Sequence, residues 1–257
     1  MNSTMIHEPL TKLQCCPTSD GAAAAVLVSQ AFLDARPELK PQAIQIAGQC
    51  LSTDTPDLFN RSAIELVGYS MSELAAKTAL KEAGVKPEEV RVCELHDCFS
   101  ANEMVTIEAL GLAEKGKAHE LIRAGGITYG GKVVINPSGG LISKGHPLGA
   151  TGLAQCAELV WHMRGWANNR SVSDTKVALQ HNLGLGGAVV VTVYKRADGS
   201  AAEDLSSEEV GKRNGLGYNP AVVAKGFTKA QVDSVRSKKA RSQWALQDTA
   251  EKVEARF

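Results

Sequence analysis

Residues 177–194 read VALQHNLGLGGAVVVTVY, and this stretch decides the fold. Residues 177–180 and 188–194 are apolar, and the second run is rich in β-branched side chains, which favour strands. The glycines between the two runs allow the chain to turn. The stretch therefore predicts a β-hairpin with His181 at its corner.

A second buried strand is expected over residues 90–95 (VRVCEL). A helix should follow from Ser100, because SANE at 100–103 has the form of a capping box. His96 and Cys98 then occupy a strand-to-helix corner, and their side chains point to the same side if the extended geometry continues. The positive end of the helix favours a Cys98 thiolate, which could act as an acid or a base.

The third corner lies in the glycine-rich run at 139–152. Pro147 suits the first position of a helix that ends near Gly165, which places His146 at the helix cap. The helix dipole disfavours an imidazolium, so His146 is expected to be neutral and able to accept a proton. The alternation of strands and helices indicates an α/β protein, and three polar corners suggest one site at the ends of its sheet.

Each of these side chains also has a simpler interpretation. A histidine at a strand end is more often structural than catalytic, and Cys98 alone could be a small buried apolar residue. Zinc binding by His96, Cys98 and Cys93 is a further alternative. We expect no metal, because no second pair of ligands follows at the spacing of a zinc finger.

Composition excludes several classes of protein. The chain has 257 residues, 44% of them hydrophobic, and it carries 28 basic and 28 acidic side chains. Charge therefore gives no bias toward nucleic acid or membrane surfaces. The six cysteines do not follow a secreted disulfide pattern, and neither a signal segment nor a membrane span is expected. These features predict a reduced intracellular compartment.

Three parts are expected along the chain. Residues 1–67 hold an apolar segment, a short β-like run and a polar stretch. Residues 68–196 alternate strands and helices and finish with the hairpin. Residues 197–257 are polar and charged, which predicts a flexible or loosely helical tail.

Long runs of the sequence resemble a known family. HDCFSANE at 96–103, YGGKVVINPSGGLISKGHPLGATG at 129–152 and ALQHNLGLGGAVVVTVYK at 178–195 are similar to the C-terminal half of thiolases of the peroxisomal sterol-carrier-protein (SCP-x type) branch. CCPTSDGAAAAVLVS at 15–29 resembles the end of the thiolase N-terminal half. The resemblance implies the layered α-β-α-β-α thiolase fold, with 68–196 as a complete C-terminal domain and 1–67 as a remnant of the N-terminal half.

The resemblance also implies roles for four residues in an acyl transfer that passes through a cysteine thioester. His146 matches the histidine that activates the nucleophilic cysteine, and His96 takes the place of an asparagine whose bound water helps to form an oxyanion hole. Cys98 is expected to be the second acid or base, because His181 stands where most thiolases carry that cysteine. His181 then has a polar or oxyanion role. The implied substrates are acyl-CoA and CoA, with no bound cofactor.

The thiolase nucleophile itself is not expected in this chain. Cys15, Cys16, Cys50 and Cys156 do not match its context, and Cys15 and Cys16 are interpreted as ordinary buried thiols. We therefore expect a 3-oxoacyl-CoA thiolase of peroxisomal lipid metabolism that is incomplete by itself. The alternative is a non-catalytic half that binds CoA esters or pairs with a full-length thiolase. The resemblance also implies a homodimer.

Two expectations concern the C-terminal end. Ala255-Arg256-Phe257 resembles a peroxisomal address, although the usual signal ends in leucine, so a peroxisomal location is expected and a cytoplasmic one otherwise. The lipid-carrier domain that is fused to some members of the branch is not expected, because the tail is short and polar.

Overall fold

The computed structural model describes residues 3–184, 187–223 and 228–237. The chain divides into two compact units, Met1–Val222 and Val223–Phe257. The second unit contains helix α9 (Lys229–Arg236), and the first contains every other element. None of the described helices combines the length and the apolar character that a membrane crossing requires.

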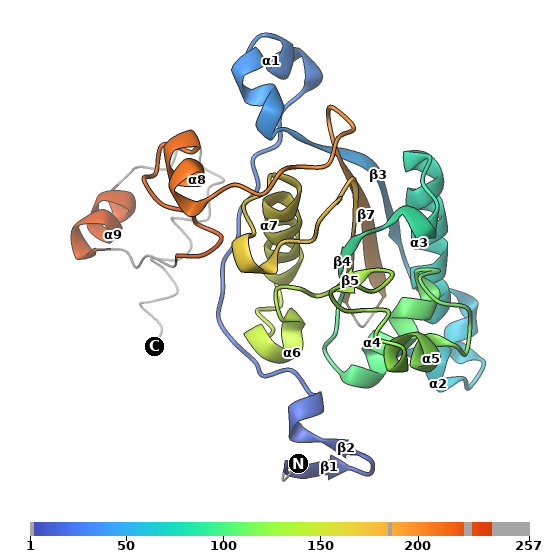
Figure 1. Ribbon diagram of the computed structural model, residues 1–257. Helices are drawn as coiled ribbons and strands as arrows, with labels where there is room; N and C mark the ends of the chain where they lie inside the picture. Colours follow the sequence, from blue (N-terminus) through green and yellow to red (C-terminus); the bar gives the residue numbers. More distant parts are fainter. Residues whose placement is uncertain (1–2, 185–186, 224–227, 238–257) are drawn as a thin grey trace. The chain divides into compact units, whose positions relative to one another are not determined.

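Five strands of the described chain form one mixed sheet, which Figure 1 shows between its covering helices. β7 (Ala188–Arg196) is antiparallel to both β3 (Ile44–Ser52) and β6 (Val177–Gly184). β4 (Val92–Glu94) runs parallel to both β6 and β5 (Val134–Ile135). The carboxyl ends of β4 and β6 therefore lie at the same edge of the sheet. The order across the sheet is β3, β7, β6, β4 and β5.

Helices cover both faces of this sheet (Figure 1). The face that presents Leu179 packs against α3 (Tyr69–Ala83) and the end of α4 (Ser100–Ala109). The opposite face, which presents Ala178, packs against α7 (Thr151–Met163). Successive residues of a strand point to opposite faces, so β6 contributes to both cores. This layered arrangement confirms the predicted α/β fold class.

Shorter elements connect the layers. Residues 21–29 have no regular secondary structure, and α6 (Gly140–Lys144) ends two residues before the predicted site residue His146. The short elements are β1 (Met5–His7), β2 (Leu10–Thr11), α1 (Gln30–Asp34), α2 (Ala63–Leu66), α5 (Ala118–Arg123), α6 (Gly140–Lys144) and α8 (Ser207–Arg213).

The predicted hairpin is confirmed, but two details around the site residues are wrong. β6 continues to Gly184, so His181 pairs with Val191 inside the ladder and does not stand at the corner. Helix α7 begins at Thr151, and His146 lies before it in an isolated bridge with Thr18. His146 is therefore not a helix cap, because the chain from Pro147 to Ala150 forms a turn before the helix starts.

The boundary expected at residue 67 does not separate two parts of the fold. β3 lies before that boundary, yet it pairs along most of its length with β7 at the other end of the domain. Residues 44–52 therefore complete the sheet of the following part, and the origin of residues 1–67 as a remnant of the N-terminal half stays a prediction.

The tail expected from residue 197 is also packed at its beginning. Val210 of α8 and Ala221 form a small buried cluster with Trp166, and Asn219 Nδ2 donates to the Trp166 carbonyl at 2.8 Å. A few apolar residues are enough to form this cluster, because the Trp166 side chain alone provides a large apolar surface.

This packing gives the first prediction. Val210→Asp should increase hydrogen exchange at the amides of α8 by more than tenfold, because a carboxylate would be buried against Trp166 without a partner. Val222→Asp is the matched control, since Val222 is 46% exposed. Equal exchange in the two variants would show that α8 does not depend on this cluster.

Candidate functional site

A cysteine that the sequence interpretation left outside the site contacts His146. The backbone N–H of His146 donates to the Pro17 carbonyl at 2.9 Å, which ties this histidine to residues 16–18. Cys16 Sγ then lies 3.4 Å from His146 Nδ1. The description of Cys15 and Cys16 as ordinary buried thiols is therefore wrong, because both are only partly buried and Cys16 has an imidazole as its partner.

The imidazole of His96 stands beside that of His146. The ring centroids are 4.8 Å apart and the planes meet at 75°, an edge-to-face contact. Burial lowers the pKa of His96 to about 4, and burial also lowers the pKa of His146. Both rings are thus neutral near pH 7. The predicted neutrality of His146 is confirmed, but its physical cause is burial, since no helix begins at this residue.

His181 is fully buried, and both of its ring nitrogens have partners. The backbone N–H of His96 donates to His181 Nδ1 at 3.4 Å, and Ser72 Oγ lies 3.0 Å from His181 Nε2. Burial lowers the pKa of His181 to about 3. These contacts make His181 a positioning residue that supports the backbone of His96. Both ring nitrogens are thus engaged by protein groups, and the polar or oxyanion role expected for His181 stays a prediction.

The backbone of Cys98 connects this residue to Cys16, the partner of His146. The N–H of Cys16 donates to the Cys98 carbonyl at 2.9 Å. Burial raises the pKa of Cys98 to about 11. The predicted thiolate is therefore wrong, because desolvation outweighs the backbone N–H groups at the start of α4. Cys98 is a neutral thiol near pH 7, which can donate a proton.

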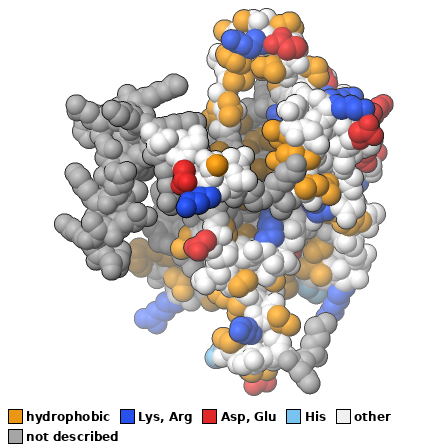
Figure 2. Space-filling model, turned by 90° about the vertical axis from the view of Figure 1, so that its left-hand side faces the viewer, with side chains coloured by type: hydrophobic (Ala, Val, Ile, Leu, Met, Phe, Trp, Pro, Cys, Tyr) orange, Lys and Arg blue, Asp and Glu red, His pale blue; other side chains and the backbone are white. Residues whose placement is uncertain are grey.

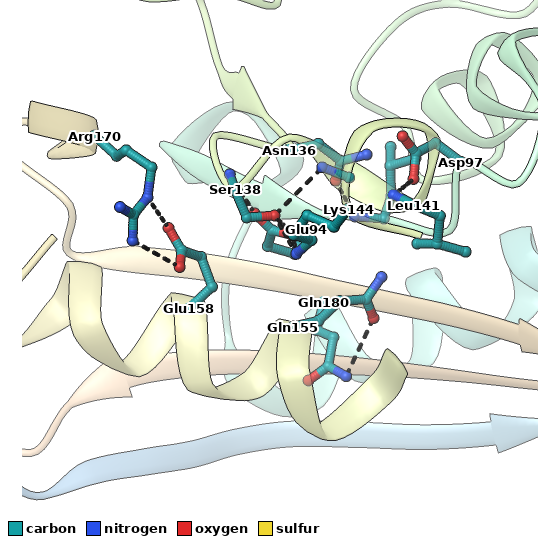
Figure 3. A network of polar contacts seen from close by, with 12 residues as sticks. Glu94, Asp97, Asn136, Ser138, Leu141, Lys144, Gln155, Glu158, Arg170 and Gln180 are labelled. Atoms are coloured by element: carbon teal, nitrogen blue, oxygen red, sulfur yellow. Dashed lines mark hydrogen bonds and ion pairs between the residues drawn. The ribbon is translucent and has the colours of Figure 1, made fainter. Parts of the chain in front are cut away.

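Two buried acids at the end of β4 hold the loop that leads to His146 (Figure 3). Glu94 accepts hydrogen bonds from the Ser138 backbone at 3.1 Å and from its hydroxyl at 2.7 Å. Asp97 Oδ1 accepts the N–H of Leu141 at 2.6 Å. Gly140 has φ +60°, and a Cβ there would overlap the Asp97 carboxylate. The loop therefore requires glycine at this position.

Glu94 gives a prediction for pH dependence. Burial raises its pKa from 4.5 to about 7, so the folded protein holds this proton more tightly than the unfolded chain. The resulting stability is present below pH 4.5 and is lost as pH rises through about 7. Between pH 4.5 and 8, the unfolding free energy should fall by up to about 3 kcal/mol more than in Glu94→Gln.

Urea unfolding of the wild type and of Glu94→Gln across this range measures the difference. Exposed Glu88→Gln is the matched control and should follow the wild type. If the wild type and Glu94→Gln show parallel pH dependence, Glu94 does not keep its proton in the folded state.

A pocket of about 350 Å³ opens beside His146. Residues 19–23 form one side and residues 147–150 the other. Its lining is mostly glycine, alanine and proline, so the backbone is accessible to a ligand. Among the described residues, no group of three or more histidine, cysteine, aspartate or glutamate side chains could hold a metal ion.

The structure thus brings His96, Cys98, His146 and His181 to one edge of the sheet, as predicted, and adds residues that the sequence interpretation missed. Asn182 Nδ2 lies 3.5 Å from His96 Nδ1. Cys16 and Ser72 were missed because each reaches the site from a distant part of the chain. Glu94 and Asn182 could have been found, since they lie two residues before His96 and directly after His181.

Comparisons with known proteins identify the family of this arrangement. Residues 53–196 match the family described as "Thiolase C-terminal domain-like". Bovine sterol carrier protein 2 is 58% identical over 203 residues, which are 79% of this chain and 37% of that protein. An acetyl-CoA acetyltransferase of Methanothermobacter thermautotrophicus is 39% identical over 197 residues, 76% of this chain and 50% of that one. The chain therefore spans half or less of the length of these relatives.

A solved structure supports the same fold. A chain of the Ltp2-ChsH2(DUF35) aldolase superposes with a TM-score of 0.60 at 21% identity, over 76% of this chain and 50% of the other. At this identity the likeness concerns the fold alone. Together with the family match over more than half of the sequence, it shows that the chain belongs to the thiolase C-terminal domain-like family.

Proposed function

We propose that this chain supplies the acid, base and oxyanion groups of an acyl-CoA C-acyltransferase that cleaves 3-oxoacyl-CoA with CoA. The observation that carries the proposal is the contact between two neutral imidazoles, His96 and His146, beside a buried protonated thiol, Cys98. This set can both accept and donate protons near pH 7. A relative named as an acetyl-CoA acetyltransferase agrees with this chemistry.

In the proposed reaction, His146 accepts the proton of a cysteine thiol, and the resulting thiolate attacks the 3-oxo carbonyl of the substrate. The N–H of neutral His96, acting through a water, stabilises the oxygen anion that forms. Cleavage of the carbon–carbon bond leaves an acetyl-CoA carbanion, and Cys98 donates its proton to that carbon. The Cys98 thiolate then takes the thiol proton of CoA, the CoA sulfur attacks the thioester carbonyl, and the cysteine that leaves recovers its proton from His146. A thiol with a pKa of about 11 suits proton donation to a carbanion.

We place the nucleophilic cysteine in the part of a thiolase that the matched region does not include. The relatives are at least twice as long as the matched region, so the rest of their chains is long enough to contain this cysteine. The pocket between residues 19–23 and 147–150 lies beside His146, and we assign it to the CoA substrate. Small residues line it, which allows backbone groups to contact the ligand.

The test is reconstitution. The chain is mixed with the region of bovine sterol carrier protein 2 that precedes the match, and thiolysis of acetoacetyl-CoA is followed spectrophotometrically. We expect no turnover from either part and measurable turnover from the mixture. Turnover by this chain alone would contradict the proposal that the nucleophilic cysteine lies in another part of the thiolase. A complex that forms on size-exclusion chromatography and yet does not turn over would contradict the acyltransferase role.

A second candidate is a non-catalytic half that binds CoA esters and pairs with itself or with a full-length thiolase. It is favoured by exposed apolar side chains: Val26 is 91% exposed, Leu27 77%, Phe59 84% and Leu148 79%. Figure 2 shows hydrophobic side chains spread over one face, including the region of α1 at its top. Calorimetric binding of CoA without turnover in the reconstituted mixture would select this candidate.

We also propose a peroxisomal location, on the ground of the family branch. The address at Ala255-Arg256-Phe257 lies outside the described residues. A fluorescent protein fused to the N-terminus should follow peroxisomes in cells. Deletion of the last three residues should release it to the cytoplasm.

A further inference from the structure

Cys16 and Cys98 lie on the two segments of a short antiparallel pairing. Cys15 and Phe99 form an isolated antiparallel bridge, and the N–H of Cys16 donates to the Cys98 carbonyl at 2.9 Å. If this register continues by one step, Cys16 lies opposite Cys98. In antiparallel segments the α-carbons of opposite residues are about 4.5–5.5 Å apart, and their side chains project to the same side. A disulfide spans about 4.4–6.8 Å between α-carbons.

The two thiols differ in exposure and in their partners. Cys16 is partly exposed, and its sulfur lies 3.4 Å from His146 Nδ1, which can accept the thiol proton. Cys98 is buried. Burial raises the pKa of both groups, and each lies close enough to the other for charge on Cys16 to raise the pKa of Cys98. A reagent from solution therefore meets Cys16 first.

We propose that Cys16 and Cys98 form a dithiol site for hydrogen peroxide. Cys16 gives its proton to His146, and the thiolate attacks one peroxide oxygen, which breaks the O–O bond and leaves a sulfenic acid at Cys16 and one water. The Cys98 sulfur then attacks the Cys16 sulfur, the second oxygen leaves as water, and a disulfide forms. Two thiols lose two electrons in total, and the peroxide is reduced to two waters.

Cys15 is next to Cys16 but does not compete for this bond. Successive residues of an extended segment point to opposite sides, so the Cys15 side chain faces away from Cys98. Its sulfur donates to the Thr11 carbonyl at 3.6 Å. Cys15→Ser is therefore a matched control for Cys16→Ser, with the same chemical change one position away.

The experiment uses the chain alone and does not depend on the proposed acyltransferase function. The reduced protein is treated with hydrogen peroxide, remaining thiols are alkylated, and the intact mass and peptide map are measured. We expect a product lighter by two hydrogens with Cys16 linked to Cys98, in the wild type and in Cys15→Ser. Cys98→Ser should stop at a Cys16 sulfenic acid that dimedone traps. His146→Ala should slow the first step by about tenfold or more.

Any other linkage in the wild type, or a free Cys98 after full oxidation of Cys16, would overturn the proposal. Circular dichroism shows whether each variant is folded. The wild-type peptide map decides the linkage even if a variant does not fold.

Discussion

Replacing His146 by alanine is expected to slow formation of the acyl-enzyme by about 10³-fold in the reconstituted assembly described above. Among His96, His146 and His181, His146 alone combines a lowered pKa with incomplete burial, so it can reach the thiol of the nucleophilic cysteine. Without it, that thiol loses the base that accepts its proton. Rapid-quench measurement of the covalent acyl intermediate from acetoacetyl-CoA gives the rate of this step.

Cys98→Ala is the companion variant, because it should change a different step. Proton donation to the carbanion depends on the Cys98 thiol, whereas attack by the nucleophile does not. We expect acylation by a simple thioester donor, which requires no carbon–carbon cleavage, to remain within about threefold of wild type. Thiolysis of acetoacetyl-CoA should fall by at least about 10²-fold. Equal losses in both reactions would contradict a separate role for Cys98.

Gly48→Ala is expected to lower the unfolding free energy by about 4 kcal/mol, at the upper end of what overpacking costs. Gly48 lies in β3, where a Cβ would overlap the Ala79 carbonyl of α3 and approach the Ala83 nitrogen to 2.9 Å. These atoms belong to a helix backbone, so the whole helix would have to move. The same helix carries Ser72, the partner of His181, and its displacement should loosen the site as well.

Urea denaturation followed by far-ultraviolet circular dichroism measures this loss. Gly149→Ala is the matched control, because an added Cβ there has nothing within 4 Å. We expect the control to unfold at the wild-type urea concentration. If both variants unfold with the wild type, the close approach of β3 to α3 does not exist in solution.

Several parts of the fold could be predicted because their signals are local. The hairpin follows from two apolar runs around glycines, and α4 begins at the predicted residue. Boundaries were less well predicted. The proline at 147 suits a helix start, but the chain makes a bridge and a turn first, and α7 begins only at Thr151. Because most residues after 197 are polar, the sequence did not indicate the small core around Trp166.

The protonation of the site could not be predicted in the same way. Cys98 precedes a helix, which favours a thiolate, yet the layers on both sides of the sheet remove water from it and raise its pKa to about 11. Burial also lowers the pKa of His181, and its contacts with Ser72 and the backbone of His96 could not be foreseen from its place in the strand.

The sequence by itself determined the α/β class, the hairpin and the identity of the residues at the sheet edge, because each depends on patterns within a few neighbouring positions. The tertiary structure alone decided which groups meet and in which protonation state. Cys16 and His146 are 130 residues apart, and only the pairing of residues 15–18 with the site brings their side chains into contact. Burial depends on all the elements packed around a group, so a local stretch of sequence cannot specify it.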